Sequence, residues 1–127
     1  MNYAILRTAK LKTMGNIGGS LAHNYRTIET PNADPNLTSK NHHTVATPEA
    51  VKQIIKDRLP EKRRSDAVLC IEYLITASPE WEGWGNSLED EFFKRSAQWL
   101  IDKHGAGNIA GMSIHRDIST PQLVAYV

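Results

Sequence analysis

The stretch AVLCIEYLITA, residues 67–77, constrains the fold more than any other part of the sequence. It is rich in branched and aromatic apolar residues, which favour strands, and it carries a single charge, Glu72. A run this apolar does not suit the edge of a sheet, where one side would meet water. We therefore predict that residues 67–77 form a central strand.

Two helical patterns flank this strand. Residues 48–59 follow Thr47, which can cap a helix, and start with Pro48 at the first helical position; their apolar side chains recur at helical spacing. Residues 87–104 are expected to start at Ser87 as the capping residue and to stop at Gly105. Both segments are predicted to be amphipathic helices.

Three further stretches have the composition of strands: residues 2–12, 108–117 and 121–127, the last two being joined by a short turn around 119–121. The expected order is strand, long loop, helix, strand, helix, strand, strand. This order predicts the α+β class, with a mainly antiparallel sheet and the two helices packed on one of its faces. A chain of 127 residues suffices for one such domain, residues 1–127.

Between the first strand and the first helix we expect no regular structure. The segment MGNIGGS, residues 14–20, contains three glycines that interrupt the strand pattern. Residues 20–43 hold two prolines, four asparagines and three of the five histidines, with little periodicity. Long loops in compact domains are usually functional or mobile, so residues 20–43 are a place to look for a site.

The formal net charge of +1 says little about partners. Local charge is more informative, because Arg7, Lys10 and Lys12 fall in the first dozen residues and are expected to lean one way from their strand. The single cysteine, Cys70, allows no disulfide within the chain and is expected to fill core volume. Neither a signal peptide nor an apolar run of about 18 residues is present, so a cytoplasmic location is expected.

One histidine is placed where a side chain could carry chemistry. His115 stands near the end of the strand 108–117, beside Arg116 and Asp117, where it would project from the sheet as a candidate metal ligand. Taken alone, a single histidine is more often structural or merely exposed, and the same alternative applies to His23 in its loop. His104 is explained as a positive partner of a helix C-terminus.

Four stretches together resemble one family, the plasmid mobilisation/recombination relaxases of the Mob/Pre group, also called MobV. The opening YAILRTAKLKTMGNIGGSLAHNYR is similar to that family's start, a strand, a Gly-Gly loop and a His-Asn-x-Arg motif, matched by His23, Asn24 and Arg26. NADPNLTSKNHH resembles its second motif, and RSDAVLCIEYLITAS resembles its central strand. IHRDISTPQLVAYV resembles the third motif, His-x-Asp-Glu-x-Thr-Pro-His, so the resemblance spans almost all of the chain.

The resemblance implies a function and a set of site residues. Relaxases of this kind nick one strand of plasmid DNA at its transfer origin, stay covalently attached to the 5′ end and later rejoin the ends, using manganese or magnesium to polarise the phosphate. By this resemblance His23 is the nucleophile and Arg26 holds the phosphate or the loop. The implied metal ligands are His115, Asp117 and Gln122. The residues expected to contact single-stranded or origin DNA are Asn24 of the first motif and, for their positive charge, Arg7, Lys10, Lys12, Arg63, Arg64 and Arg116.

The third motif departs from the family pattern at three positions. Ile118 replaces a glutamate, Gln122 replaces a histidine, and Val124 replaces a further histidine seen in part of the family. An amide is a weaker ligand for these ions than imidazole or carboxylate, so metal binding is predicted to be weak or lost. Relaxase domains of this kind continue past the third motif, and we expect the chain to be a partial, truncated domain.

Three functions remain open at this point. The first is a relaxase-type strand transferase, and the second is a catalytically inactive DNA-binding remnant whose basic residues follow the DNA backbone while aromatic residues stack on bases. The third is a small α+β module with an unrelated role. Within the first, Tyr25 is the rival of His23 as nucleophile, because tyrosine serves other relaxase families; we expect His23.

Overall fold

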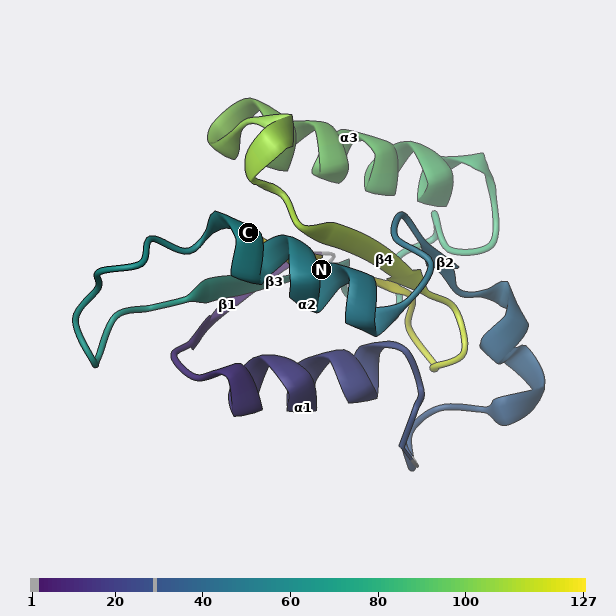
Figure 1. The fold of residues 1–127 in the computed structure, drawn as a ribbon. Coiled ribbons are helices and arrows are strands. Elements are labelled where there is room, and N and C mark those ends of the chain that lie inside the picture. Colours follow the sequence, from purple (N-terminus) through teal and green to yellow (C-terminus); the bar gives the residue numbers. More distant parts are fainter. Residues whose placement is uncertain (1–2, 29) are drawn as a thin grey trace.

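The computed structural model describes residues 3–28 and 30–127, which form a five-stranded sheet with helices on both faces (Figure 1). The strands run in the spatial order β1-β3-β5-β4-β2, and every neighbouring pair is antiparallel. Their bounds are β1 Ala4–Leu11, β2 His42–His43, β3 Cys70–Ala77, β4 Gly111–His115 and β5 Gln122–Tyr126. The predicted α+β class and antiparallel sheet are confirmed; position 2 of the first predicted strand lies outside the described residues.

The interior position of β3 is also confirmed, since β3 pairs with β1 on one side and with β5 on the other. The two C-terminal stretches pair with each other as predicted, and His115 lies directly opposite Gln122 in their register. That register matters for the site, because residues facing each other across two strands project from the same face.

Three α-helices accompany the described strands: α1 Met14–Asn24, α2 Pro48–Arg58 and α3 Ser87–His104. Thr47 caps α2 as predicted, its side chain accepting a hydrogen bond from the Ala50 amide at 3.1 Å. The cap of α3 is Asn86 rather than Ser87, because the Asn86 side chain accepts from the Leu88 amide at 2.9 Å. Gly105 follows the last residue of α3, and as glycine it adopts its positive φ of 86° without a steric penalty.

The prediction that both helices pack on one face of the sheet is wrong. α1 and α2 cover one face, where Ile17, Leu21, Val51 and Ile55 form a buried cluster with residues of β3 and β5. α3 covers the opposite face (Figure 1). Its buried cluster is Tyr73, Ile75, Phe93, Leu100, Leu123 and Ala125. Because side chains alternate along a strand, β3 and β5 are apolar on both faces, and the sequence pattern of each helix does not say which face it covers.

The helix α1 replaces a segment predicted to be an irregular loop. Three glycines at 15, 18 and 19 weaken helix propensity by about 1 kcal/mol each relative to alanine. Burial of Ile17 and Leu21, spaced by one helical turn, outweighs that cost, and Thr13 caps the helix by accepting from the Asn16 amide at 2.9 Å. A short 3₁₀ helix, Pro35–Lys40, and the two-residue edge strand β2 further order the predicted loop.

No helix in the described part of the chain is long and apolar enough to cross a membrane. Cys70 is buried in the core as predicted, and burial raises the pKa of its thiol to about 11. The thiol therefore stays protonated and packs as an apolar side chain.

Candidate functional site

The first and third predicted motifs meet on the face of the sheet that carries α1. Arg26, just after α1, and Asp117, just after β4, form an ion pair in which Nε and Nη2 of the arginine donate to the two carboxylate oxygens, each at 2.7 Å. The Asp117 side chain is fully buried. This two-pronged geometry is the strongest form of arginine–carboxylate pairing, and it joins residues that are 91 positions apart.

Arg26 has an unusual backbone conformation, and this conformation ends the helix α1. The Thr27 amide donates to the Ala22 carbonyl and the Arg26 amide to the His23 carbonyl, the pattern that ends many helices with a left-handed residue. That residue is normally glycine, yet here Arg26 has a φ of 57°. A non-glycine residue costs roughly 1 kcal/mol in this conformation, and the buried pair with Asp117 offsets it.

The same arginine also holds the turn that carries His23. Its Nη1 donates to the His23 carbonyl oxygen at 2.7 Å, while its other two nitrogens remain on Asp117. Arg26, first among several causes, holds the pKa of Asp117 at about 2, so the carboxylate is ionised at neutral pH. Thr38 of the 3₁₀ helix donates to the same carboxylate at 3.2 Å. Asp117 is therefore surrounded by hydrogen-bond donors.

His115 lies buried beneath the end of α1, only 2% exposed. Its Nε2 lies 2.9 Å from the backbone oxygen of Asn24, so this nitrogen carries the proton and donates. Its Nδ1 lies 3.3 Å from the Gln122 amide nitrogen across the β4–β5 pair. Burial, followed by the positive charge of Arg26, lowers the pKa of His115 to about 4, and the imidazole is neutral at pH 7.

Four polar residues surround His115: Asn24 and Tyr25, which the sequence singled out for other roles, and Ser113 and His43, which it did not single out. Asn24 donates from its side chain to Ser113 Oγ at 3.1 Å, and Ser113 shares a 2.6 Å hydrogen bond with His43 Nδ1. The His43 ring stacks on Tyr25 with 4.2 Å between centroids. Ser113 could have been found from the sequence, because it stands two residues before His115 and so shares its face. No local signal pointed to His43, which tertiary pairing of β2 with β4 brings here.

The predicted metal ligands do not fit a metal centre. Both ring nitrogens of His115 have partners, and both oxygens of Asp117 are bound by Arg26. Within residues 3–28 and 30–127, no group of three or more His, Cys, Asp or Glu side chains lies close enough to hold a metal ion. The buried Asn24 Oδ1 lacks a hydrogen-bond partner in that part of the chain, but it is a neutral amide oxygen. The expectation of a metal set at His115, Asp117 and Gln122 is not supported.

The two rival nucleophiles differ in where their side chains point. His23 is exposed on α1, on the side turned away from the buried residues Ile17, Leu21 and Asn24. Tyr25 is half-buried, its hydroxyl donates to the Val45 carbonyl at 2.7 Å, and burial raises its pKa. The tyrosine hydroxyl is thus occupied inside the protein, whereas the imidazole of His23 is open to solvent.

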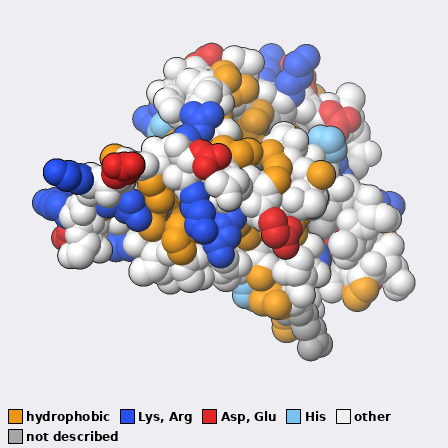
Figure 2. Space-filling model, viewed as in Figure 1, with side chains coloured by type: hydrophobic (Ala, Val, Ile, Leu, Met, Phe, Trp, Pro, Cys, Tyr) orange, Lys and Arg blue, Asp and Glu red, His pale blue; other side chains and the backbone are white. Residues whose placement is uncertain are grey.

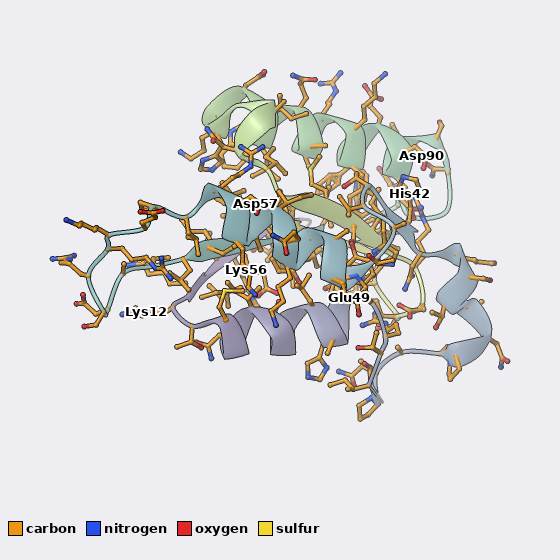
Figure 3. All side chains as sticks on the ribbon, viewed as in Figure 1. Lys12, His42, Glu49, Lys56, Asp57 and Asp90 are labelled. Carbon is orange, nitrogen blue, oxygen red and sulfur yellow. The ribbon has the colours of Figure 1, made fainter. Side chains whose placement is uncertain are left out.

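The predicted DNA contacts separate into exposed and internal residues. Arg7, Lys10, Lys12, Arg63 and Arg64 are all exposed. The prediction that Arg7 and Lys10 point to the same side is wrong, because residues three positions apart along β1 lie on opposite faces of the sheet. Lysine and arginine side chains gather at the connector 59–69 and along α2 (Figure 2), and Lys12 and Lys56 lie on this side of the molecule (Figure 3).

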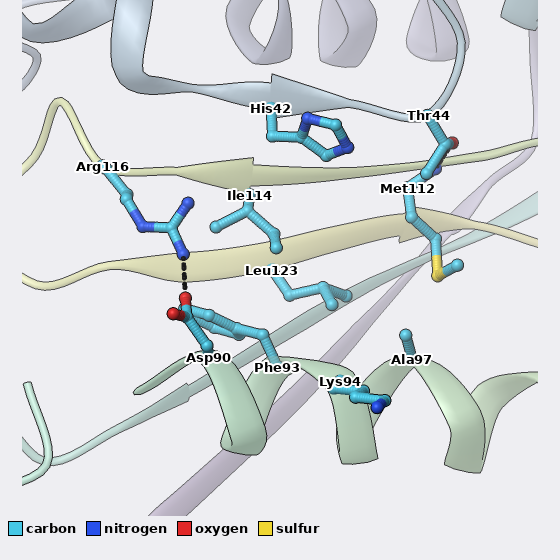
Figure 4. A pocket seen from close by; sticks show the side chains of 10 residues that line it. All are labelled: His42, Thr44, Asp90, Phe93, Lys94, Ala97, Met112, Ile114, Arg116 and Leu123. Atoms are coloured by element: carbon cyan, nitrogen blue, oxygen red, sulfur yellow. Dashed lines mark hydrogen bonds and ion pairs between the residues drawn. The ribbon is translucent and has the colours of Figure 1, made fainter. Parts of the chain in front are cut away.

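Asn24 and Arg116, two other predicted DNA contacts, are tied into the protein. The Asn24 side chain is buried under α1 on Ser113. Arg116 points away from His115, because the residues at 115 and 116 leave the strand on opposite sides; its guanidinium pairs with Glu89 at 2.9 Å and Asp90 at 3.1 Å of α3. It borders a pocket of about 210 Å³ between α3 and the sheet, with an apolar floor that includes Phe93 and Leu123 (Figure 4).

Known proteins resemble the chain over nearly its whole length. A family model described as plasmid recombination enzyme, Mob_Pre, matches residues 1–126. A plasmid recombination enzyme of Streptococcus agalactiae is 32% identical over 97% of this chain and 27% of its own length. A plasmid recombination enzyme type 2 of Staphylococcus aureus is 31% identical over 97% of this chain and 32% of its own length. The chain thus spans about a quarter to a third of these relatives.

Solved structures of the MobM relaxase domain share the fold. One, bound to manganese and to 22-nucleotide pMV158 oriT DNA with a 3′-thiophosphate, superposes with a TM-score of 0.80 at 28% identity, covering 98% of this chain and 69% of that one. Another, bound to 26-nucleotide pMV158 oriT DNA, has a TM-score of 0.66 at 28% identity. With the family model and the joined first and third motifs, these matches show that the chain belongs to the Mob/Pre family of plasmid recombination enzymes.

Proposed function

We propose that this chain binds single-stranded DNA of a plasmid transfer origin and that His23 is the residue that attacks a phosphodiester of that DNA. The observation that carries the proposal is the Arg26–Asp117 pair, with Arg26 also bound to the His23 carbonyl. It fixes the turn that carries His23 onto the strand that carries the third motif. The relaxase domains that share this fold are bound to oriT DNA, which supports the same class of partner here.

The exposed basic surface supports binding to a DNA backbone. Residues 56–66, from the last turns of α2 into the connector, contain five Lys or Arg and three Asp or Glu. All eight of these charged side chains are exposed. Lysine and arginine that neutralise phosphates release counterions, so binding through this surface would weaken steeply with salt. This local excess of positive charge stands out against a net charge of only +1 for the whole chain.

A pocket beside Arg26, lined by both polar and apolar residues, offers room for a nucleotide near His23. Its volume is about 690 Å³. It is lined by Arg26, Thr27, Ile28, Thr30, Pro31, Ala33, Pro35 and Thr38. Because Arg26 bridges this pocket and the His23 carbonyl, a DNA strand passing through the pocket would reach the turn that presents His23.

The chemistry proposed for His23 is nucleophilic displacement at phosphorus. The lone pair of an imidazole nitrogen forms a bond to phosphorus while the bond from phosphorus to the 3′ oxygen breaks. The ring loses the proton on its other nitrogen to water, and the 3′ oxygen takes a proton from water in return. The 5′ phosphate is then held on the histidine as a phosphoramidate, and attack by a 3′ hydroxyl reverses the step. Arg26 acts as a positioning residue for this turn. We propose that the protein acts in the cytoplasm, where plasmid DNA is present.

The test uses purified protein and a single-stranded oligonucleotide carrying the pMV158 oriT sequence, with duplex and scrambled single-stranded DNA as controls. Wild type is expected to bind both single strands more tightly than the duplex and to form an acid-labile adduct with the origin strand. His23→Ala should abolish the adduct and keep binding, whereas Tyr25→Phe should keep both. An acid-stable adduct that Tyr25→Phe removes would contradict the assignment of His23. Binding without any adduct would instead indicate an inactive DNA-binding domain.

A further inference from the structure

The third motif places positions 115, 122 and 124 on one face of the sheet, as a site with several histidines would require. Of these three positions only 115 carries a histidine. His115 faces Gln122, and Ser113 faces Val124, so these four positions share the α1 face of the sheet. Two of the three positions that depart from the family pattern, Gln122 and Val124, therefore lie beside His115. Val124 is 4% exposed inside the apolar cluster under α1 and offers no donor atom.

The two candidate metal ligands on this face, His115 and Asp117, already have partners, whereas the neutral amide oxygen Asn24 Oδ1 has none among the described residues. His115 donates to the Asn24 carbonyl and lies within hydrogen-bond distance of Gln122, so a cation would have to displace an existing partner from either ring nitrogen. Asp117 gives both oxygens to Arg26 and receives Thr38 as well. A divalent ion would have to break these contacts, and breaking a buried ion pair leaves an uncompensated charge.

The electrostatic balance of the site also disfavours a cation. The negative charge of Asp117 is already matched by Arg26, and Gln122, Asn24 and Ser113 are neutral. Manganese and magnesium take mostly carboxylate and imidazole ligands in proteins. Since the glutamate position of the motif holds Ile118, the site lacks the anionic ligand that would draw such an ion.

We infer that the metal centre implied by the family has become a metal-independent hydrogen-bond network in this protein, and that its DNA binding requires no divalent cation. The inference rests on the proposed function for its DNA part alone. In place of a cation, the contacts from His115 to Asn24 and from Asp117 to Arg26 hold the end of α1 on the sheet and so position His23.

Two measurements test this on wild-type protein stripped of metal with EDTA. Titration calorimetry with manganese chloride is expected to show no saturable binding. Fluorescence anisotropy with the single-stranded oriT oligonucleotide should give the same Kd, within twofold, in EDTA and in manganese. Saturable binding of one manganese per chain that His115→Ala removes would overturn the inference, as would DNA binding that appears only with manganese.

A gain-of-function variant tests the physical cause. Ile118→Glu with Gln122→His and Val124→His restores the family's donors, and manganese binding should appear and raise the Tm. Because Val124 is buried, the triple variant can fail to fold, and the double variant Ile118→Glu with Gln122→His is therefore tested as well. It should bind manganese more weakly than the triple variant but more tightly than the wild type. If either variant folds, as judged by a cooperative melt, and gains no manganese affinity, then side-chain replacement is not why the site lacks a metal.

The two proposals fail separately in these experiments. Absence of DNA binding in both buffers would refute the proposed function, while the manganese titration would still decide the inference on the metal. Manganese-dependent DNA binding would support the proposed function and refute the inference.

Discussion

The two faces of the sheet use opposite kinds of interaction around the same strands. The α3 face is apolar and aromatic: Phe93 stacks on Phe92 with 5.4 Å between ring centroids and packs in a cluster with Leu100. The α1 face instead carries two sets of polar contacts, one from His43 through Ser113 and Asn24 to His115 and the other between Arg26 and Asp117. Apolar packing is non-directional, whereas hydrogen bonds fix geometry. The α3 face is therefore suited to stability, and the α1 face to placing a turn.

The largest effect on stability is expected from the α3 face. Phe93→Ala deletes a ring that is 2% exposed, and it should lower the free energy of unfolding by about 4 kcal/mol because a cavity remains. Urea denaturation measures this loss. The variant should still bind DNA with wild-type Kd under conditions where it is folded. If the folded variant also lost DNA affinity, the conclusion that the α3 face serves stability and not DNA binding would be contradicted.

On the α1 face, Arg26→Met should leave Asp117 as a buried charge without its arginine. The expected loss is about 3 kcal/mol in the free energy of unfolding, together with weaker DNA binding. Arg116→Met is the matched control on the other face: its ion pairs are partly exposed, so the loss should be about 1 kcal/mol, with DNA affinity unchanged. Equal effects of the two substitutions would contradict the special role of the Arg26 turn.

Acid should weaken the protein through the α1 face. The folded-state pKa of His115 is about 4, below its ordinary value near 6.5, so the unfolded chain binds more protons between these values. Stability is then present above pH 6.5 and falls as the pH drops toward 4, by about 2 kcal/mol between pH 7 and 4.5. His43 shifts in the same direction, mainly through burial. The Asp117 contribution is lost only at lower pH, as the pH falls from about 4 toward 2.

Denaturation curves at a series of pH values measure this dependence. His115→Gln removes the titrating ring at similar size, and it should flatten the slope between pH 6.5 and 4.5. A slope equal to that of the wild type would show that other groups, and not His115, cause the acid sensitivity.

The smallest effect on stability is expected at the connector. Arg63→Ser and Arg64→Ser alter exposed side chains that make only surface contacts, so the free energy of unfolding should change little. Each should nevertheless weaken DNA binding and reduce its salt dependence by about one counterion. Arg95→Ser on the exposed side of α3 is the control, and it should change neither quantity. If Arg95→Ser weakened DNA binding and the connector substitutions did not, DNA would bind at α3, which contradicts the proposed DNA surface.

Periodicity predicted the parts of the fold whose patterns are strong. The apolar composition of residues 67–77 and of the C-terminal stretches predicted strands there correctly, although β3 begins only at Cys70 and β4 covers only Gly111–His115. Thr47 with Pro48 marked the start of α2 correctly. The helix α1 was not predicted, because three glycines lower the helix propensity of this segment. The helix forms because Ile17 and Leu21 are buried against the sheet, which local sequence does not show. The face on which each helix packs is likewise a tertiary property.

The motifs predicted that His23, Arg26, His115 and Asp117 lie in one region. In the structure Arg26 binds Asp117 and the His23 carbonyl, and His115 binds the Asn24 carbonyl next to His23. The catalytic and binding roles of these residues remain predictions. The sequence alone could not predict that Asp117 pairs with Arg26 rather than with an ion, or that Arg116 reaches α3. Those outcomes depend on which side of β4 each residue leaves the sheet, and that follows from the register with β2 and β5.

Amide hydrogen exchange with and without the single-stranded oriT oligonucleotide, in EDTA, tests most directly that DNA engages the α1 face without a metal. DNA should slow exchange in the last turn of α1 with the following residues 25–28 and in the connector 59–69, while α3 remains unchanged. Protection confined to α3, or protection of α1 that appears only after manganese is added, would contradict this account.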